Sequence, residues 1–116
     1  HARNSLAPED FTLAPIGAAE RVLAKAGWSA SDVDLWEINE AFAMVTMLTT
    51  RALDLDPACV NVHGGACAQG HPIGSTGSRI IVTLMHALKH YGKQRGVAAL
   101  CIGGGEATAV AIELVS

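Results

Sequence analysis

Apolar side chains recur at helical spacing in two early segments of the chain. In the first, residues 15–26, Pro15 stands near the start and Gly27 just past the end, an asymmetry typical of helices. In the second, residues 41–52, apolar positions follow one face of a helix: Ala41, Met44, Val45, Leu48 and Ala52. Both segments are therefore predicted to be helices.

A third helix is predicted from about residue 75 to residue 90. Apolar side chains occupy nearly every side of it: Ile80, Ile81, Val82, Leu84, Met85, Ala87 and Leu88. Because a helix that is apolar all round belongs in an interior, we expect this one to be a buried central helix.

Short apolar runs predict four strands, at residues 35–38, 60–62, 97–102 and 107–115. Residues 31–34 are predicted to form a turn or a short helical piece. Only residues 103–106, three of them glycines, separate the last two strands, which is too short for a crossover, so that pair is predicted to be antiparallel. Strands alternating with helices indicate the α/β class, with a mixed sheet covered by helices.

Composition fits one domain, residues 1–116, and excludes several partners. Half of the residues are apolar and only 16% are charged, which is more apolar than a small domain needs for its own interior. We expect the additional apolar residues to lie in a buried helix or on a surface that faces another domain or subunit. The net charge is −3 and no Lys/Arg run exists, so neither nucleic acid nor an anionic membrane is an expected partner. No apolar stretch is long enough to cross a bilayer, and three cysteines indicate reduced thiols inside a cell.

Residues capable of chemistry gather where predicted strands end, the usual place for sites in open α/β folds. His71 stands in a glycine-rich loop, and its ring suits either proton transfer or bracing of the loop by a hydrogen bond. Asn39 either caps the helix that begins near Glu40 or points its amide into a site.

Cys101 ends an apolar strand and precedes three glycines. A buried cysteine is usually a small apolar residue, whereas the N–H groups of adjacent glycines are suited to an oxyanion hole or to a plain tight turn. Cys67 lies close enough in sequence to His71 for a nucleophile pair to be conceivable. No Cys-x-x-Cys pair occurs, and His86 and His90, four residues apart in the last turns of a predicted helix, are explained by favourable placement at the helix dipole, so no metal is expected.

Taken together, these segments resemble the thiolase family over nearly the whole chain. The matching motifs stand in the family's order: Asn39-Glu40-Ala41-Phe42, then Asn61-x-x-Gly64-Gly65-Ala66 running into Gly70-His71-Pro72-x-Gly74-x-x-Gly77, then Cys101-x-Gly103-Gly104-Gly105. The resemblance implies the C-terminal half of a thiolase. None of Cys59, Cys67 and Cys101 stands in the context of the family's Cys-x-Ser/Gly nucleophile motif, since Cys101-x-Gly103 belongs to the C-terminal signature. We therefore expect this chain to be inactive alone.

The resemblance also implies a role for each matching residue. His71 would activate the nucleophilic cysteine of an N-terminal domain, and Cys101 would be the acid/base at the α-carbon of the second acyl-CoA. Asn39 would hold a water in one oxyanion hole, and the N–H of Gly103 would contribute to another. Ala41 and Phe42 would lie near the pantetheine arm of coenzyme A.

Further expectations follow from the same resemblance. Acyl-CoA and CoA would be substrates, with no separate cofactor, and the full-length protein would form a homodimer or homotetramer. The expected compartment is the cytoplasm, with mitochondria or peroxisomes as alternatives. Glu106-Ala107-Thr108 and Gln69 depart from residues frequent in thiolases.

Two other functions remain open at this point. A decarboxylating ketoacyl-synthase-type enzyme would carry a second histidine or asparagine where Cys101 stands. A non-catalytic thiolase-like binding module would have no need for Asn39, His71 and Cys101 together.

Overall fold

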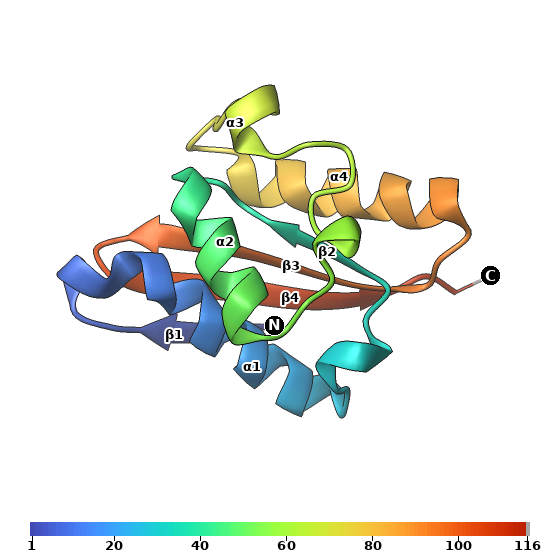
Figure 1. Ribbon diagram of the computed structural model, residues 1–116, viewed down its shortest axis with the longest axis horizontal. Helices are drawn as coiled ribbons and strands as arrows, with labels where there is room; N and C mark the ends of the chain where they lie inside the picture. The colour runs from blue at the N-terminus through green and yellow to red at the C-terminus, as the bar shows by residue number, and fades with distance from the viewer. Residues whose placement is uncertain (116) are drawn as a thin grey trace.

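A four-stranded mixed sheet forms the centre of the computed structural model, which describes residues 1–115 (Figure 1). The strands are β1 (Ala2–Ser5), β2 (Leu35–Ile38), β3 (Arg95–Gly103) and β4 (Glu106–Glu113), in the order β1-β4-β3-β2. Strands β2 and β3 are parallel, whereas β4 is antiparallel to both of its neighbours. The predicted α/β class and the antiparallel final pair are confirmed.

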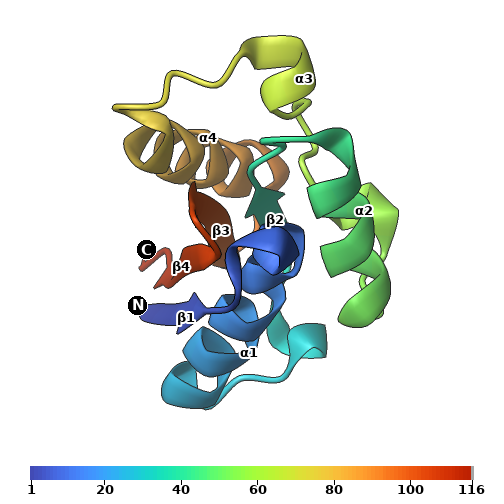
Figure 2. The same ribbon diagram turned by 90° about the vertical axis from the view of Figure 1, so that its left-hand side faces the viewer.

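Helices cover both faces of this sheet (Figure 2). On one face lie α1 (Ala14–Ala26) and, beside it, α2 (Ala43–Ala52), and on the other face lies α4 (Thr76–Tyr91). The connections contain short helical turns: η1 (Pro8–Leu13), η2 (Ala30–Asp32), η3 (Pro57–Cys59) and α3 (Ala66–Gln69). The prediction that α1 has Pro15 near its start and ends before Gly27 is confirmed, because Gly27 follows the helix in the left-handed conformation at φ 71.

Two apolar clusters hold these layers together, one on each face. Because successive strand residues point to opposite faces, neighbours in β3 join different clusters. Ala99 packs with the α1 side, and Ala98 packs with Leu84 and Leu88 of α4. Gly96 allows this close approach, since a Cβ there would overlap the side chain of Leu84.

Helix α4 is buried on one side only, so the prediction of a helix buried all round is wrong for this chain. Ile80 and Leu84 are fully buried against the sheet, whereas Val82 and Met85 are 52% and 40% exposed. The reason is that the sheet covers one face of the helix and no layer within residues 1–115 covers the other. No helix in the described part of the chain is both long and apolar enough to cross a membrane.

The strand predicted at residues 60–62 is also wrong. Val60 makes one isolated parallel bridge to Trp36, and the chain then turns because Asn61 adopts φ 49. The side chain of Asn61 replaces the missing ladder, since its Oδ1 accepts from the N–H of Ile38 and its Nδ2 donates to the carbonyl of Ile38, both at 2.8 Å.

Strand β1 was not predicted because its sequence, Ala-Arg-Asn-Ser, lacks apolar alternation. Pairing with β4 and the side chain of Asn4 fix it in place instead. Nδ2 of Asn4 donates to the carbonyl of Ala14 at 3.1 Å, which ties the strand to the start of α1.

Candidate active site

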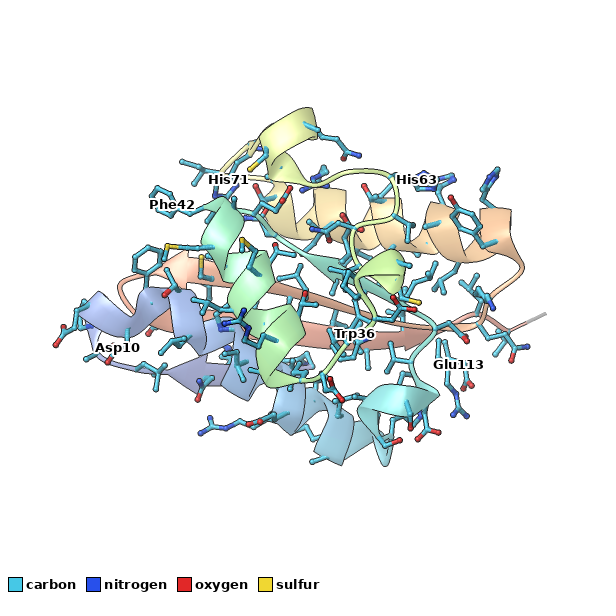
Figure 3. The ribbon with its side chains drawn as sticks, in the orientation of Figure 1. Asp10, Trp36, Phe42, His63, His71 and Glu113 are labelled. Atoms are coloured by element: carbon cyan, nitrogen blue, oxygen red, sulfur yellow. The ribbon has the colours of Figure 1, made fainter. Side chains whose placement is uncertain are left out.

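The parallel strands β2 and β3 end at the same edge of the sheet, and the candidate residues follow from there. The N–H of Asn39 donates to the carbonyl of Ala99 at 2.9 Å, which extends the parallel ladder by one step beyond β2. Asn39 and Cys101 are thereby carried on adjacent strand ends. His71 and Phe42 lie toward the same end of the molecule (Figure 3).

Asn39 is buried rather than capping a helix. Helix α2 begins at Ala43 and its N-cap is Phe42, so the capping interpretation of Asn39 is wrong. The residue is 1% exposed, and its Oδ1 accepts from Nη2 of Arg79 at 3.4 Å. Its Nδ2 is buried and has no acceptor among residues 1–115. A buried amide donor of this kind is costly unless it serves a water or a ligand.

His71 stands in the exposed loop between α3 and α4, just after Gly70, which has φ 96. Its Nδ1 lies 2.7 Å from Oγ1 of Thr76, and the same hydroxyl donates to the carbonyl of Pro72 at 2.9 Å. A hydroxyl has one proton, so satisfying both contacts requires Nδ1 of His71 to be the donor. This leaves Nε2 unprotonated in the neutral ring and available as a base.

Cys101 lies near the end of β3 and is 7% exposed. Burial raises the pKa of its thiol above the ordinary value, so the thiol is protonated at neutral pH. Among the hydrogen bonds of residues 1–115, none joins Cys101 to His71.

The three glycines after Ile102 form a tight turn into β4. All three have positive φ, with values of 102 for Gly103, 61 for Gly104 and 87 for Gly105. Residues with a side chain rarely adopt this conformation. The ladder with β4 shifts register between Cys101 and Gly103, so a bulge lies beside the thiol. The tight turn alone therefore explains why glycine occupies all three positions. An oxyanion role for the N–H of Gly103 stays a prediction.

The spacing of Asn61 and Gly65 has a structural basis in this fold. Asn61 ties the loop to the end of β2, and Oε1 of Glu40 accepts from the N–H of Cys67 at 3.3 Å. Gly65 lies between these two side chains, so that a Cβ there would overlap both of them. These contacts anchor the loop that leads to His71.

A buried ion pair below Asn39 was not anticipated from the sequence. Oε1 of Glu37 lies 3.5 Å from Nη1 of Arg79, and the side chain of Glu37 is 2% exposed. Burial raises the pKa of Glu37 from 4.5 to about 7, with Arg79 opposing that shift and Glu40 adding to it. The sequence feature that could have indicated this ion pair is a single carboxylate inside an apolar strand, because a buried carboxylate needs a cationic partner.

Ala41 and Phe42 leave the strand edge toward α2. Ala41 is half-buried, whereas Phe42 is 59% exposed, with its ring edge-on to Phe11 at a centroid distance of 5.8 Å. A cavity of about 730 Å³ lies between α2 and residues 57–65. Its lining includes Glu40 and Asn61 but none of the three candidate catalytic side chains.

Two further possibilities are a Cys67–His71 nucleophile pair and a metal site. Cys67 is exposed, and the Nδ1 hydrogen bond of His71 is to Thr76 instead. Within residues 1–115 no group of three or more His, Cys, Asp or Glu side chains is placed to hold a metal ion.

This fold and this edge of the sheet define a C-terminal domain of the thiolase type. The chain belongs to the thiolase family, because the model of the thiolase C-terminal domain matches residues 1–114.

Relatives in the family are similar over nearly all of this chain. The cytosolic acetyl-CoA acetyltransferase of Mus musculus is 53% identical over 106 residues, covering 91% of this chain and 27% of that protein. The acetyl-CoA acetyltransferase of Yarrowia lipolytica is 51% identical over 116 residues, covering 100% and 29%. The chain therefore spans less than a third of the length of these relatives.

Solved structures are similar to the same extent. The Acat5 thiolase of Ascaris suum, crystallised in complex with coenzyme A, superposes with a TM-score of 0.92 at 47% identity, covering 98% of this chain and 29% of that one. The acetyl-CoA acetyltransferase of Bacillus anthracis superposes with a TM-score of 0.95 at 44% identity over the same shares. The alternative of a ketoacyl-synthase-type enzyme is not favoured by these relatives.

Proposed function

We propose that the full-length protein is an acetyl-CoA acetyltransferase and that this domain supplies its proton-transfer residues. The reaction would join two acetyl-CoA molecules into acetoacetyl-CoA and free CoA, or run in reverse as thiolysis. One observation carries the proposal: the buried Nδ2 of Asn39, which has no acceptor among residues 1–115, and the Cys101 thiol lie at the ends of adjacent parallel strands at one edge of the sheet.

His71 has the tautomer that the first step needs. Its Nδ1 proton is committed to Thr76, so Nε2 takes the proton from the nucleophilic cysteine of the N-terminal domain. That thiolate attacks the thioester carbonyl of the first acetyl-CoA, and CoA leaves with the proton that His71 returns. The acetyl group is then held as an enzyme thioester.

Cys101 acts at the α-carbon of the second substrate. In thiolysis its protonated thiol, the form favoured by burial, delivers a proton to the enolate of the departing acetyl-CoA. In condensation the thiolate of Cys101, the minor form at neutral pH, removes that proton, and the carbanion attacks the enzyme thioester. The thioester carbon–sulfur bond then breaks, which releases acetoacetyl-CoA and returns the nucleophilic cysteine as a thiolate. Nδ2 of Asn39, through a water, and the N–H of Gly103 would each stabilise a developing oxyanion.

Substrate and domain contacts complete the proposal. Coenzyme A thioesters are the substrates, no further cofactor is required, and the pantetheine arm would pass Ala41 and Phe42. The N-terminal domain would cover the exposed apolar side chains of this chain: Phe42, Met44, Met47, Val82 and Met85. Contact with the N-terminal domain would explain why α4 carries apolar side chains on the face that the sheet leaves exposed. A homodimer or homotetramer of the full-length protein is proposed as well.

The test is thiolysis of acetoacetyl-CoA by the full-length protein in the presence of free CoA. Activity that falls by orders of magnitude in His71→Ala and in Cys101→Ala, with both variants folded, is the expected result. A folded full-length protein without thiolysis or condensation would instead favour the non-catalytic binding module.

A further inference from the structure

Arg79 links three polar side chains beneath the candidate active site. Its Nη1 contacts Oε1 of Glu37 at 3.5 Å and Oε1 of Gln69 at 3.0 Å, and its Nη2 contacts Oδ1 of Asn39 at 3.4 Å. The side chain is 19% exposed, and its Nε is buried with no acceptor among residues 1–115. None of the residue roles derived above makes use of it.

The contact with Arg79 determines which way the amide of Asn39 faces. A guanidinium has five N–H donors and no acceptor, so the amide atom opposite it must be the oxygen. The alternative orientation would place the Nδ2 donor against a cation. Nδ2 is therefore turned away from Arg79, toward the side where it has no acceptor among residues 1–115.

The other contacts of Arg79 hold the guanidinium itself in place. Glu37 lies in β2 two residues before Asn39, and when ionised it supplies the opposing charge. Gln69 adds an acceptor from α3, and its Nε2 donates to the carbonyl of His63 at 2.7 Å. Thus the loop before His71 is joined to the same guanidinium.

Arg79 also shares the first turn of α4 with Thr76. Residues three apart lie on one side of a helix, and Thr76 is the residue that binds Nδ1 of His71. The start of α4 is thereby in contact with both His71 and Asn39, which come from different loops.

We propose that Arg79, held by Glu37, is a positioning residue that orients the Asn39 amide for oxyanion stabilisation in the reaction proposed above. The inference rests on the proposed function, because Asn39 must take part in catalysis for its orientation to matter. Lysine cannot replace Arg79, since a single ammonium lacks the planar fork that spans Glu37 and Asn39.

The experiment is a double-mutant cycle in the full-length protein, with kcat and KM measured for acetoacetyl-CoA thiolysis. Asn39→Ala is expected to lower kcat by about 100-fold, as for loss of one oxyanion-hole donor. Arg79→Lys is expected to lower kcat by about 10-fold with KM within about twofold, as for loss of an outer-shell contact. In the Asn39→Ala background, Arg79→Lys is expected to have no further effect, because the amide it orients is gone.

Arg95→Lys is the matched control, because Arg95 also pairs with a glutamate, Glu113, at 2.8 Å but on the exposed outer part of the hairpin. It should leave kcat and KM at their wild-type values. If Arg79→Lys acts equally in the wild-type and Asn39→Ala backgrounds, or if it leaves kcat unchanged, the positioning role is overturned.

The same experiment separates the failure of this inference from that of the proposed function. An inactive, folded wild-type protein would refute the proposed function itself. An active wild-type protein with independent Arg79 and Asn39 effects would refute only the positioning role.

Discussion

Oγ1 of Thr76 lies 2.7 Å from Nδ1 of His71 while donating its own proton to the carbonyl of Pro72 at 2.9 Å. One buried hydroxyl therefore fixes the tautomer of an exposed histidine. The relationship is local, since all three residues lie within the loop and first turn of α4. It explains how a histidine in a glycine-rich segment has one defined unprotonated nitrogen, Nε2, in its neutral ring.

Replacing Thr76 by valine is expected to lower kcat by about tenfold or more, because the isosteric side chain removes the acceptor for Nδ1 of His71. Thr76→Ser retains the hydroxyl and is expected to restore most of the activity. The measurement is kcat for thiolysis against pH in both variants of the full-length protein. Equal activity of the valine and serine variants would contradict the tautomer assignment.

Glu37 is expected to make the folded state less stable as pH rises toward neutrality. Its pKa in the folded chain is about 7, against 4.5 ordinarily, so between these values the folded state holds a proton that the unfolded state has lost. At about 1.4 kcal/mol per pKa unit, the free energy of unfolding should fall by roughly 3 kcal/mol from pH 4.5 to pH 7.

Glu37→Gln removes this titration and should flatten the corresponding part of the pH dependence. The measurement is Tm of the full-length wild-type and variant proteins across pH 5 to pH 7, roughly the window that the shifted pKa defines. Parallel Tm curves for the two proteins would show that Glu37 does not titrate there.

Gly65→Ala is expected to destabilise the fold by about 1 kcal/mol, the low end of overpacking costs, because the carboxylate of Glu40 can move aside whereas the amide of Asn61 is held by two hydrogen bonds. The added Cβ would overlap Glu40 and Asn61, which hold the loop to the end of β2. Gly74→Ala is the control, since a Cβ there meets nothing within 4 Å. Thermal melting should separate the two variants, and equal Tm values would argue against the anchoring role of this loop.

Asn61→Ala is expected to cost about 1–3 kcal/mol, because the N–H of Ile38 loses its acceptor and the carbonyl loses a donor. Asn61→Asp keeps the acceptor but sets a carboxylate oxygen against that carbonyl, so it should be destabilising as well. Chemical denaturation of both variants checks this. Wild-type stability in Asn61→Asp would mean that the donor side of the pairing is unimportant.

Most of the fold could be predicted because its elements are strongly patterned. Helix α1 has Pro15 inside its start and Gly27 past its end, and the strands β3 and β4 flank a glycine turn. The element at residues 60–62 could not be predicted, because a side-chain amide there performs the pairing of a strand. Strand β1 could not be predicted either, since pairing with β4 rather than its own pattern makes it a strand.

Only the residues of the site that lie in recognisable motifs could be predicted from the sequence. His71, Cys101 and Asn39 were identified from their glycine-rich or strand-end surroundings, and the structure locates them without testing their roles. Arg79 and Thr76 escaped notice because each lies in a helix of ordinary pattern. Their contacts with Asn39 and His71 span 40 and 5 residues, and only the first of these depends on tertiary folding.

The most direct test of the central claim is the intact mass of full-length His71→Ala and Cys101→Ala variants after incubation with acetyl-CoA. Cys101→Ala is predicted to accumulate one acetyl group on the nucleophilic cysteine and to form no acetoacetyl-CoA, because only the carbon–carbon step needs Cys101. His71→Ala is predicted to remain unacetylated, since its nucleophile lacks a base. Acetylation of His71→Ala at the wild-type rate, or acetoacetyl-CoA formation by Cys101→Ala, would contradict the roles given to these two residues.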